Sequence, residues 1–182
     1  MKVIMISGKS QSGKDATAKL FEEQLKLINE NFKILIIHFA DPVKWLAKDF
    51  LNWDGNKNIE GRAILQTLGT EVMRKNYPTY WAEIIAKFIS AHENYWDFII
   101  IPDWRFENEF ETICQYNSDI LTIRVNRFDK NNNIYINPEM TLTQRMHISE
   151  CELDNFNFEW IIDNKGTLED LRNSINYIIE II

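Results

Sequence analysis

The chain lacks the features that mark secreted and membrane proteins. Its 182 residues include only two cysteines, Cys114 and Cys151, which lie far apart and without the spacing of a metal site. No apolar run approaches the roughly 20 residues that a membrane-spanning helix requires, and the N-terminal residues lack the pattern of a signal peptide. We therefore expect reduced thiols, no membrane partner and a cytoplasmic location.

Positive charge is also scarce. The chain has 20 lysine and arginine residues against 27 aspartate and glutamate residues, a formal net charge of −7. A nucleic-acid polymer binds to a basic face, so we expect no such polymer as the main ligand. A mononucleotide is not excluded, because a few local cations suffice for a small anion. With 45% hydrophobic residues, residues 1–182 are expected to form a single domain with a sizeable core.

The most informative feature that is present lies at the start of the chain. An apolar run over residues 1–7 predicts a buried strand, and residues 8–14 (GKSQSGK) match the phosphate-loop pattern G-x-x-x-x-G-K. Glycines let the backbone turn so that successive N–H groups point at phosphate oxygens, and the following helix N-terminus attracts the same anion. The pattern predicts a bound nucleoside triphosphate with Lys14 at its β- and γ-phosphates. An ordinary strand–turn–helix connection would leave this lysine without a role.

Asp15 stands where the phosphate-loop pattern usually has serine or threonine, whose hydroxyl binds Mg²⁺. A carboxylate there can hold the metal ion through water, because Mg²⁺ dehydrates reluctantly. It can equally orient a basic residue or a bound substrate, or simply favour the helix N-terminus. The candidate triphosphate-binding residues of this segment are Gly8, Lys9, Ser10, Gln11, Ser12, Gly13, Lys14, Asp15 and Ala16.

Strand-like and helix-like segments alternate along the rest of the chain. Strands are predicted at residues 1–7, 33–39, 98–101, 120–125 and 159–163, and helices at residues 14–28, 41–50, 61–75, 79–92, 106–116 and 167–182. This order predicts a mostly parallel five-stranded sheet covered on both faces, the three-layer α/β/α fold of P-loop NTPases. Ligands of such folds bind beyond the C-terminal ends of the strands.

Asp103 ends the apolar run of residues 98–102 and is a candidate for a second carboxylate near a metal ion. The alternative is an aspartate that merely starts a turn. ATP-hydrolysing motors commonly have glutamate after this aspartate, as the base for water, whereas Trp104 and Arg105 follow here. The pattern therefore favours phosphoryl transfer to a second substrate over hydrolysis.

Arginines are expected to neutralise the transferred phosphoryl group, because a guanidinium can hold phosphate oxygens bidentately. The candidates are Arg62, Arg74, Arg105, Arg127 and Arg145. Arg105 and Arg127 are favoured since they follow predicted strands. Arg145 belongs to an irregular segment at about residues 128–151, where a lid that closes over the phosphates is expected. For each arginine a solvated helix face is the alternative, and His147 is interpreted as structural.

An acceptor pocket is expected within a helical insertion at residues 42–95. Aromatic faces stack on bases and polar groups read base edges. The candidates are Trp45, Gln66, Glu71, Trp81 and Trp104. For the tryptophans a place in the core is an equally good interpretation. Asn164 and Gly166 follow the last predicted strand, where they are placed to border an adenine.

Six short motifs occur in order along the chain: Gly13-Lys14-Asp15, residues 39–44 (FADPVK), residues 65–71 (LQTLGTE), residues 103–109 (DWRFENE), His147-x-Ser149-Glu150 and Asp163-Asn164-x-Gly166. With these motifs the sequence resembles, over nearly its whole length, the deoxynucleoside monophosphate kinases of tailed bacteriophages and related viruses. The resemblance implies a nucleoside monophosphate kinase-like fold, ATP as phosphoryl donor, Mg²⁺ as cofactor and a deoxynucleoside monophosphate as acceptor. A viral source would place the chain in the host cytoplasm, and a homodimer is compatible with the sequence.

The resemblance also implies roles for individual residues. Lys14 and the loop amides would hold ATP, and Asp15 and Asp103 would lie near the metal ion, with water between. The residues that would act in catalysis are Lys14, Asp15, Arg127 and Arg145. The residues that would bind the acceptor are Asp41, Lys44, Gln66, Glu71, Arg74, Trp81, Asp103 and Arg105.

Ala16 departs from the family pattern, which usually has threonine directly after the loop aspartate. Adjacent helix positions face about 100° apart, so Thr17 is not expected to supply the missing hydroxyl. Two other functions remain open. Animal phosphomevalonate kinases share the Gly-Lys-Asp form of the loop, although they have no reason to carry residues 65–71. A non-enzymatic sensor would bind ATP without consuming it, but Lys14 and the arginines at strand ends count against it.

Overall fold

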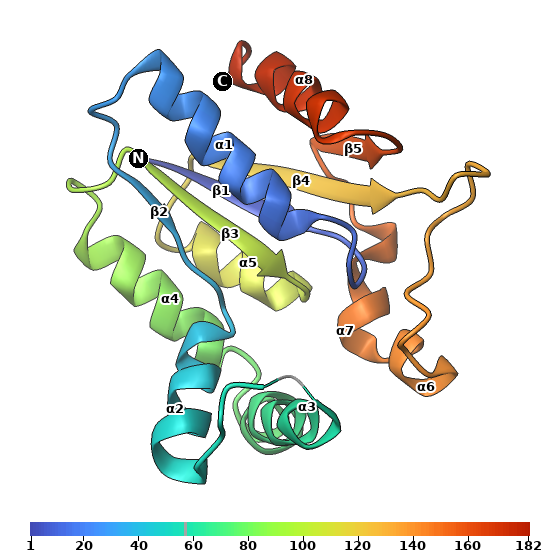
Figure 1. The fold of residues 1–182 in the computed structure, drawn as a ribbon. Coiled ribbons are helices and arrows are strands. Elements are labelled where there is room, and N and C mark those ends of the chain that lie inside the picture. The colour runs from blue at the N-terminus through green and yellow to red at the C-terminus, as the bar shows by residue number, and fades with distance from the viewer. Residues whose placement is uncertain (57) are drawn as a thin grey trace.

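The computed structural model describes residues 1–56 and 58–182, without the side chains of Ile59 and Arg62. The elements in chain order are β1 (Lys2–Ser7), α1 (Lys14–Ile28), β2 (Ile34–Ile36), α2 (Asp41–Leu51), α3 (Ile59–Gln66), η1 (Thr67–Arg74), α4 (Tyr80–Ala91), β3 (Phe98–Trp104), α5 (Glu107–Cys114), β4 (Ile120–Arg127), α6 (Leu142–Arg145), α7 (Ile148–Cys151), η2 (Glu152–Asn155), β5 (Trp160–Asn164) and α8 (Leu168–Ile179) (Figure 1). The alternation of strands and helices that the sequence predicts is confirmed.

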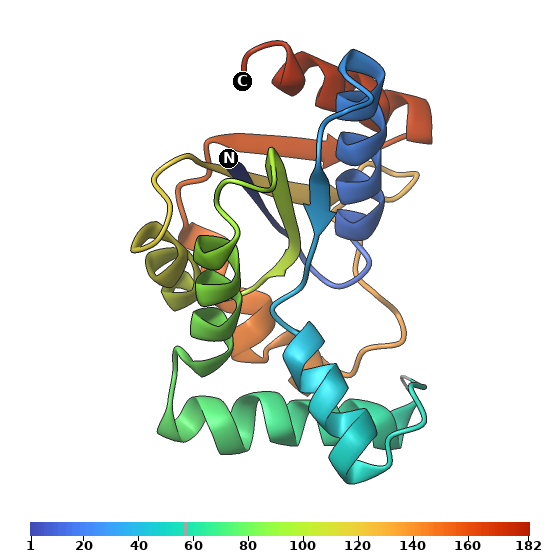
Figure 2. The same ribbon diagram turned by 90° about the vertical axis from the view of Figure 1, so that its left-hand side faces the viewer.

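The five strands form one sheet in the order β2-β3-β1-β4-β5, and all of its pairs are parallel. The central strand β1 is buried on both faces, which explains its continuous apolar run. Ile4 and Ile6 pack with α1 and α8, whereas Val3 and Met5 pack with α4 and α5. Figure 2 shows the resulting three layers, with α4 and α5 on one side of the sheet and α1 on the other.

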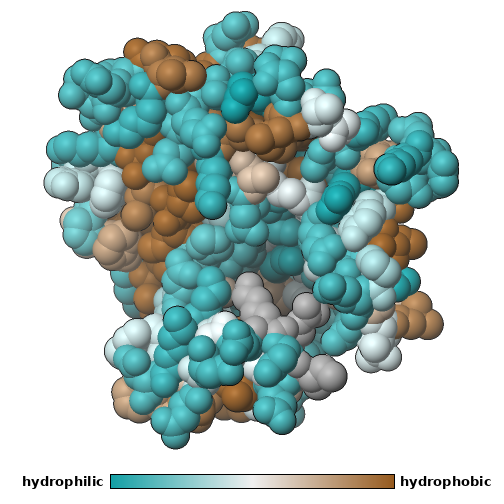
Figure 3. Space-filling model, viewed as in Figure 1, coloured by the Kyte–Doolittle hydropathy of each residue, from teal (hydrophilic) through white to brown (hydrophobic). Residues whose placement is uncertain are grey.

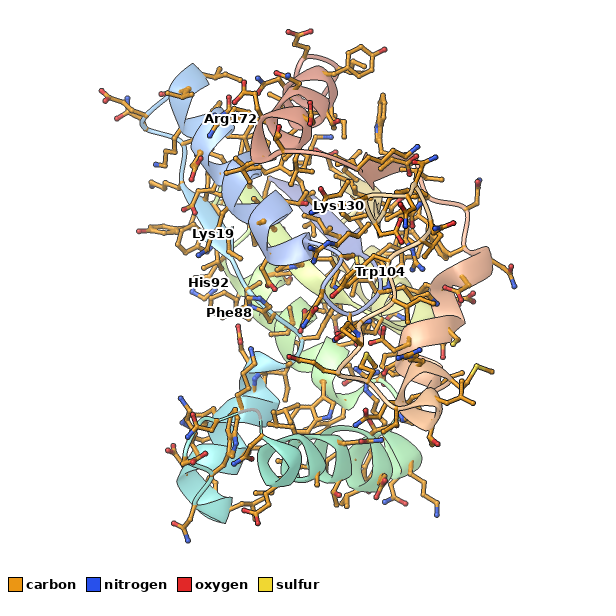
Figure 4. The ribbon with its side chains drawn as sticks, turned by 45° about the vertical axis from the view of Figure 1, so that its right-hand side comes forward. Lys19, Phe88, His92, Trp104, Lys130 and Arg172 are labelled. Carbon is orange, nitrogen blue, oxygen red and sulfur yellow. The ribbon has the colours of Figure 1, made fainter. Side chains whose placement is uncertain are left out.

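The helices α1 and α8, which cover the same face of the sheet, are also joined by a polar contact at the surface. Arg172 of α8 lies beside α1, with its guanidinium 3.7 Å from the Glu23 carboxylate (Figure 4). Trp104, by contrast, lies within the body of the molecule and packs against Phe110, Phe156 and Phe158. None of the described helices is both long and apolar enough to span a membrane.

The second strand is shorter than the apolar run at residues 33–39 predicts. Only Ile34–Ile36 belong to β2, and the chain then leaves the sheet. Ile37 N still donates to the carbonyl oxygen of Ile100 in β3, but the amides after it find other partners: His38 N donates to Asp41, and Phe39 N and Ala40 N donate to Asp103. These bonds turn the chain directly into α2.

Strand β3 carries an irregularity next to its C-terminal end. Ile101 pairs with Met5 and Trp104 pairs with Ser7, so Pro102 and Asp103 together face one residue of β1. Proline has no N–H for the sheet ladder, and such bulges re-aim a neighbouring side chain. Asp103 is therefore the penultimate residue of a longer strand than predicted, and it points toward the β2–α2 connection.

The helices α2, α3 and η1 project from the C-terminal edge of the sheet (Figure 1). The single α-helix predicted at residues 61–75 is instead α3 followed by the π-helix η1. A π-helix closes its hydrogen bonds between residues five apart. Residues five positions apart, such as Leu65 and Thr70 or Gly69 and Arg74, therefore come to the same side.

The segment between β4 and β5 is not irregular throughout, as the sequence suggests. It contains α6, α7 and the 3-10 helix η2. Thr141 caps α6 by accepting a hydrogen bond from Gln144 N, and the His147 ring caps α7 by accepting one from Ser149 N. The structural interpretation of His147 thus agrees with its position.

Candidate active site

Residues 8–13 form a tight loop between β1 and α1. Gly8 has φ of +153° and Gly13 has φ of +104°, conformations that favour glycine. A Cβ atom on Gly8 would lie 2.4 Å from the carbonyl oxygen of Val125, so no side chain fits there. The Ser12 hydroxyl is buried without a hydrogen-bond partner in the structure. The glycines therefore let the loop backbone turn this tightly, and the Ser12 hydroxyl is a donor from which an anion could accept a hydrogen bond.

Lys14 begins α1 and folds back over the loop. Its side chain is 8% exposed, and Nζ donates hydrogen bonds to the carbonyl oxygens of Gly8 and Lys9, both at 2.8 Å. Burial, with a contribution from the Arg105 guanidinium, lowers the pKa of Lys14 to about 7. A negatively charged phosphate group beside Lys14 would stabilise the ammonium form that burial disfavours.

Thr17 does not replace the hydroxyl that is missing at Ala16. Its Oγ1 is buried and donates to the carbonyl oxygen of Gly13 at 3.0 Å. Ala16 packs against the core cluster beneath α1. Neither side chain presents a hydroxyl to the loop opening, in agreement with the expectation from helix geometry.

His38 connects two of the predicted carboxylates. Its Nε2 lies 3.3 Å from Asp15 Oδ1 and its Nδ1 lies 3.3 Å from Asp41 Oδ2. Hydrogen bonds to Asp15 and then to Asp41 raise the pKa of His38 to about 9, so the ring is a cation at neutral pH. Burial alone would raise the pKa of Asp41, but hydrogen bonds from His38 and Lys44 outweigh it and hold that pKa well below its usual range.

Asp103 and Arg105 lie at the end of β3, beside the loop. Both oxygens of Asp103 accept backbone hydrogen bonds, from Phe39 N at 2.9 Å and Ala40 N at 3.0 Å. Arg105 Nη1 donates to Glu150 Oε1 at 2.8 Å and to the carbonyl oxygen of Ser149 at 3.3 Å. Asp103 thus fixes the start of the helical arm, which consists of α2, α3 and η1, and Arg105 contacts α7.

Two adjoining pockets open between the sheet edge, the helical arm and the α6–α7 segment. The outer pocket measures about 370 Å³ and the inner pocket about 160 Å³. The outer pocket is lined by Ser10, Leu65, Gln66, Thr70, Arg105, Met140, Gln144, His147, Ser149 and Glu150. The inner pocket is lined by Phe39, Ala40, Val43, Leu65, Gly69, Thr70, Arg74, Trp81, Asp103, Arg105, Phe106 and Glu109. In Figure 3, hydrophilic side chains surround the hollow above the α2–α3 arm.

The structure brings only part of the predicted acceptor set to these pockets. Gln66 lines the outer pocket, Arg105 lines both, and Arg74, Trp81 and Asp103 line the inner one. The remaining three predicted acceptor residues, Asp41, Lys44 and Glu71, are not among the lining residues of either pocket. Glu71 is exposed on η1.

The other aromatic and basic candidates lie elsewhere. Trp45 is 58% exposed and contacts Phe50 on the outside of α2. Trp104 is a core residue, as its alternative interpretation states. Trp81 combines both interpretations, because it is buried, donates to the carbonyl oxygen of Gly69 and still forms the inner wall. The side chain of Arg62 lies outside the described part of the chain.

Arg74 and Glu109 form a buried ion pair at the floor of the inner pocket. Glu109 is 1% exposed and accepts hydrogen bonds from Arg74 Nη2 and from the backbone amides of Arg105 and Phe106. The Arg74 guanidinium also lies 4.0 Å from the centre of the Phe106 ring. Burial raises the pKa of Glu109 to about 7, and the charge of Arg74 opposes that rise.

The two predicted lid arginines take different places. Arg127, the last residue of β4, donates to the Gln11 carbonyl oxygen at 3.0 Å and stacks on Tyr135. Tyr135 in turn donates to Gln11 Oε1 at 2.9 Å. Arg145 donates to the carbonyl oxygen of Asn137 and lines a third, mostly apolar pocket of about 290 Å³, which shares Ser10, Met140 and Glu150 with the outer pocket.

Asn164 ends β5 beside the loop, and Gly166 follows it two positions later. Asn164 Nδ2 donates to the Ser12 carbonyl oxygen at 3.1 Å and closely approaches Gly13. Gly166 is exposed and lies against Asp170, which caps α8. Asn164 thus supports the loop. That Asn164 and Gly166 border an adenine stays a prediction.

The sequence pattern indicates no role for His38, Glu109 or Glu150, although Glu109 and Glu150 belong to two of the six short motifs. Each of them touches a residue that was singled out: Asp15, Arg74 and Arg105, respectively. These three contacts join residues 23 to 45 positions apart along the chain, so periodicity carries no signal of them. Only the occurrence of Glu109 and Glu150 within short motifs could have drawn attention to them.

Comparison with known proteins relates most of the chain to one family. Residues 47–175 match the deoxynucleotide monophosphate kinase family. The deoxynucleotide monophosphate kinase of enterobacteria phage T4 is 24% identical over 123 residues, which make up 66% of this chain and 46% of the phage protein. The chain thus matches about half the length of this relative.

Solved structures of similar fold include two bacterial kinases. The APS kinase of Mycobacterium tuberculosis in complex with AMPPNP and APS is 11% identical, with a TM-score of 0.53 over 98% of this chain and 97% of that one. An unliganded sugar kinase from Janibacter is 12% identical, with a TM-score of 0.54 over 100% of this chain and 95% of that one. At these identities the likeness concerns the fold alone, and it confirms the predicted P-loop kinase fold.

Proposed function

Because the chain belongs to the deoxynucleotide monophosphate kinase family, we propose that it transfers the γ-phosphoryl group of ATP to a deoxynucleoside 5′-monophosphate. One observation carries the proposal: the outer pocket reaches from the phosphate loop at Ser10 to Arg105 and the helical arm. A donor phosphate on the loop and an acceptor phosphate in this pocket would be neighbours. Positioning of this kind is most of what phosphoryl transfer asks of a protein.

The donor would bind through the loop. The amides of residues 8–13 and the N-terminus of α1 would surround the phosphates, with the buried Ser12 hydroxyl as a further donor. Lys14 Nζ would exchange the carbonyl oxygens of Gly8 and Lys9 for phosphate oxygens. Arg127, which donates a hydrogen bond to Gln11 of the loop, would bind the phosphates as a second cation.

The acceptor would occupy the two pockets. Arg105, which lines both, would hold the acceptor phosphate, since a guanidinium matches phosphate oxygens. The inner pocket, walled by Trp81 and Phe106 and floored by the Arg74 pair, has the aromatic and polar lining that suits a base. Gln66 borders the outer pocket, where the sugar would lie.

A magnesium ion fits the residues that are present, provided that water completes its shell. Among the described residues no group of three or more histidine, cysteine or acidic side chains is arranged to hold a metal ion. Mg²⁺ on nucleotides is commonly held by one or two carboxylates together with phosphates and water. Asp15, whose side chain is 79% exposed beside Lys14, would supply one. When bound, the ion would neutralise charge on the β- and γ-phosphates.

The test is an assay of ADP formation from ATP and Mg²⁺ with each of the four common deoxynucleoside monophosphates, the matching ribonucleotides and phosphomevalonate. We expect turnover with at least one deoxynucleotide and its loss in Lys14→Ala. Turnover with phosphomevalonate alone would show that the acceptor is phosphomevalonate and not a deoxynucleoside monophosphate. ATP binding without turnover of any acceptor would favour the nucleotide sensor.

A further inference from the structure

Glu150 joins the phosphate loop to the acceptor side of the pocket. Its side chain lies in α7 and is only 10% exposed. Oε2 accepts a hydrogen bond from the Ser10 amide at 2.9 Å, and Oε1 accepts one from Arg105 Nη1 at 2.8 Å. One buried carboxylate therefore touches both the element that would carry the donor and the arginine that would carry the acceptor phosphate.

The backbone around Glu150 is held in place from several directions. Lys9 Nζ donates to the carbonyl oxygen of Glu150 and to Asp154, and Glu150 N donates to the carbonyl oxygen of His147. Arg105 also donates to the neighbouring Ser149 carbonyl oxygen. A carboxylate on so constrained a turn has little freedom, which is the condition for orienting another group.

The charges in this region also need a counter-ion. Arg105 is close enough to lower the pKa of Lys14, whereas Glu150 raises it. The two cations converge on the place where phosphates would lie, and Glu150 is the acidic side chain that contacts the arginine directly. Within the described part of the chain, both hydrogen bonds of the Arg105 guanidinium use Nη1, and arginine has five N–H donors. Donors are thus left to face a ligand.

We propose that Glu150 is a positioning residue, which holds Arg105 between Lys14 and the outer pocket so that its guanidinium meets the phosphate of the acceptor. The inference rests on the proposed function. Glu150 takes no proton and forms no bond to substrate in this scheme; it acts through Arg105. Alignment matters because a misplacement of about 1 Å can cost about 100-fold in rate.

The first test compares Glu150→Gln with the wild type in steady-state kinetics. The amide keeps the size of the side chain but presents an NH₂ group to a donor and removes the charge. We expect the KM for the monophosphate to rise about tenfold and kcat to fall about tenfold, while the KM for ATP changes less than threefold. Glu150→Asp, which keeps the charge, should recover part of the loss and serves if the glutamine variant does not fold.

A matched control is Glu152→Gln, two residues further along. This carboxylate accepts a hydrogen bond from Glu107 N, at the start of α5, and contacts neither the loop nor Arg105. Its kinetic constants should equal those of the wild type. A second control combines Glu150→Gln with Arg105→Gln. If Glu150 acts through Arg105, the double variant should be no slower than Arg105→Gln alone.

The outcomes separate this inference from the proposed function. Wild-type protein that phosphorylates no monophosphate would overturn both. Active wild-type protein with a Glu150→Gln variant that matches Glu152→Gln would overturn the positioning role alone. So would equal increases in the KM for ATP and for the acceptor, which would indicate damage to the loop, or strictly multiplicative losses in the double variant.

Discussion

Lys14 carries its charge where the surrounding protein disfavours it. The ammonium is buried, donates hydrogen bonds to two carbonyl oxygens and lies near Arg105, so its pKa is about 7 rather than near 10.5. A triphosphate at the loop would favour the charged form. Binding of ATP and protonation of Lys14 are therefore linked.

This linkage predicts proton uptake when ATP binds. The pKa of Lys14 is about 7 in the free protein and higher in the complex, so between these two values binding takes up a proton. Affinity should fall as the pH rises above 7, by up to about tenfold for each pH unit. Calorimetry at pH 8 in two buffers of different ionisation enthalpy measures the uptake. The Lys14→Met variant should show none, and a wild type without uptake would contradict the linkage.

At the residue scale the sequence predicts whatever a local motif encodes. The loop glycines, Lys14 and the buried Thr17 follow from spacing along a strand, a turn and a helix. The environment of Glu150 does not, because its two partners lie 140 and 45 positions away and meet only when β1, β3 and α7 are in place.

At the scale of elements, the Arg74–Glu109 pair is what ties η1 to α5. Arg74→Met would leave Glu109 buried without its counter-charge. We expect the free energy of unfolding to fall by about 3 kcal/mol at pH 8, as measured by urea denaturation.

The pH dependence of this loss follows from the raised pKa of Glu109, about 7. At pH 5 the folded state already holds Glu109 in its neutral form, so the loss of Arg74 should cost less there than at pH 8. Lys75→Met, at the exposed next position, is the control and should change stability little. A loss of equal size at both pH values would contradict the account.

Element types follow from the sequence better than element lengths do. Hydrophobic periodicity predicts each of the five strands, but not that β2 ends at Ile36, because that end depends on the bonds of Asp103 to two amides. The sequence does not predict the π-helix either, since residues 61–75 show ordinary helical spacing and the contacts of Gly69 with Val43 and Trp81 join different helices.

At the scale of the whole molecule, two segments flank the site beside the central sheet: the helical arm and the segment between β4 and β5. The segment between β4 and β5 contacts the loop through side-chain hydrogen bonds, such as those of Asn137 to Ser10 and Tyr135 to Gln11. Segments of this kind close over ligands in many enzymes.

Closure predicts a local change in amide hydrogen exchange. A bisubstrate analogue that joins adenosine and a deoxynucleoside through phosphates should slow exchange in residues 134–151 and in the arm, and leave the central strands unchanged. Mass spectrometry of peptic fragments measures this. Lys14→Ala should weaken the effect, and identical exchange with and without the analogue would count against a lid.

The π-helical turn of η1 makes the wall of the inner pocket depend on chain length as well as on residue type. Deleting one residue from Thr67–Arg74 would let the helix return to the α form. If the deleted residue is Thr67 or Leu68, Gly69 and Arg74 stay five positions apart and would lie about 140° apart around an α-helix, although every residue that lines the two pockets is retained. An insertion or deletion of a single codon in this helix is thus a route by which related genes could diverge in acceptor preference, while the sheet and the phosphate loop stay the same.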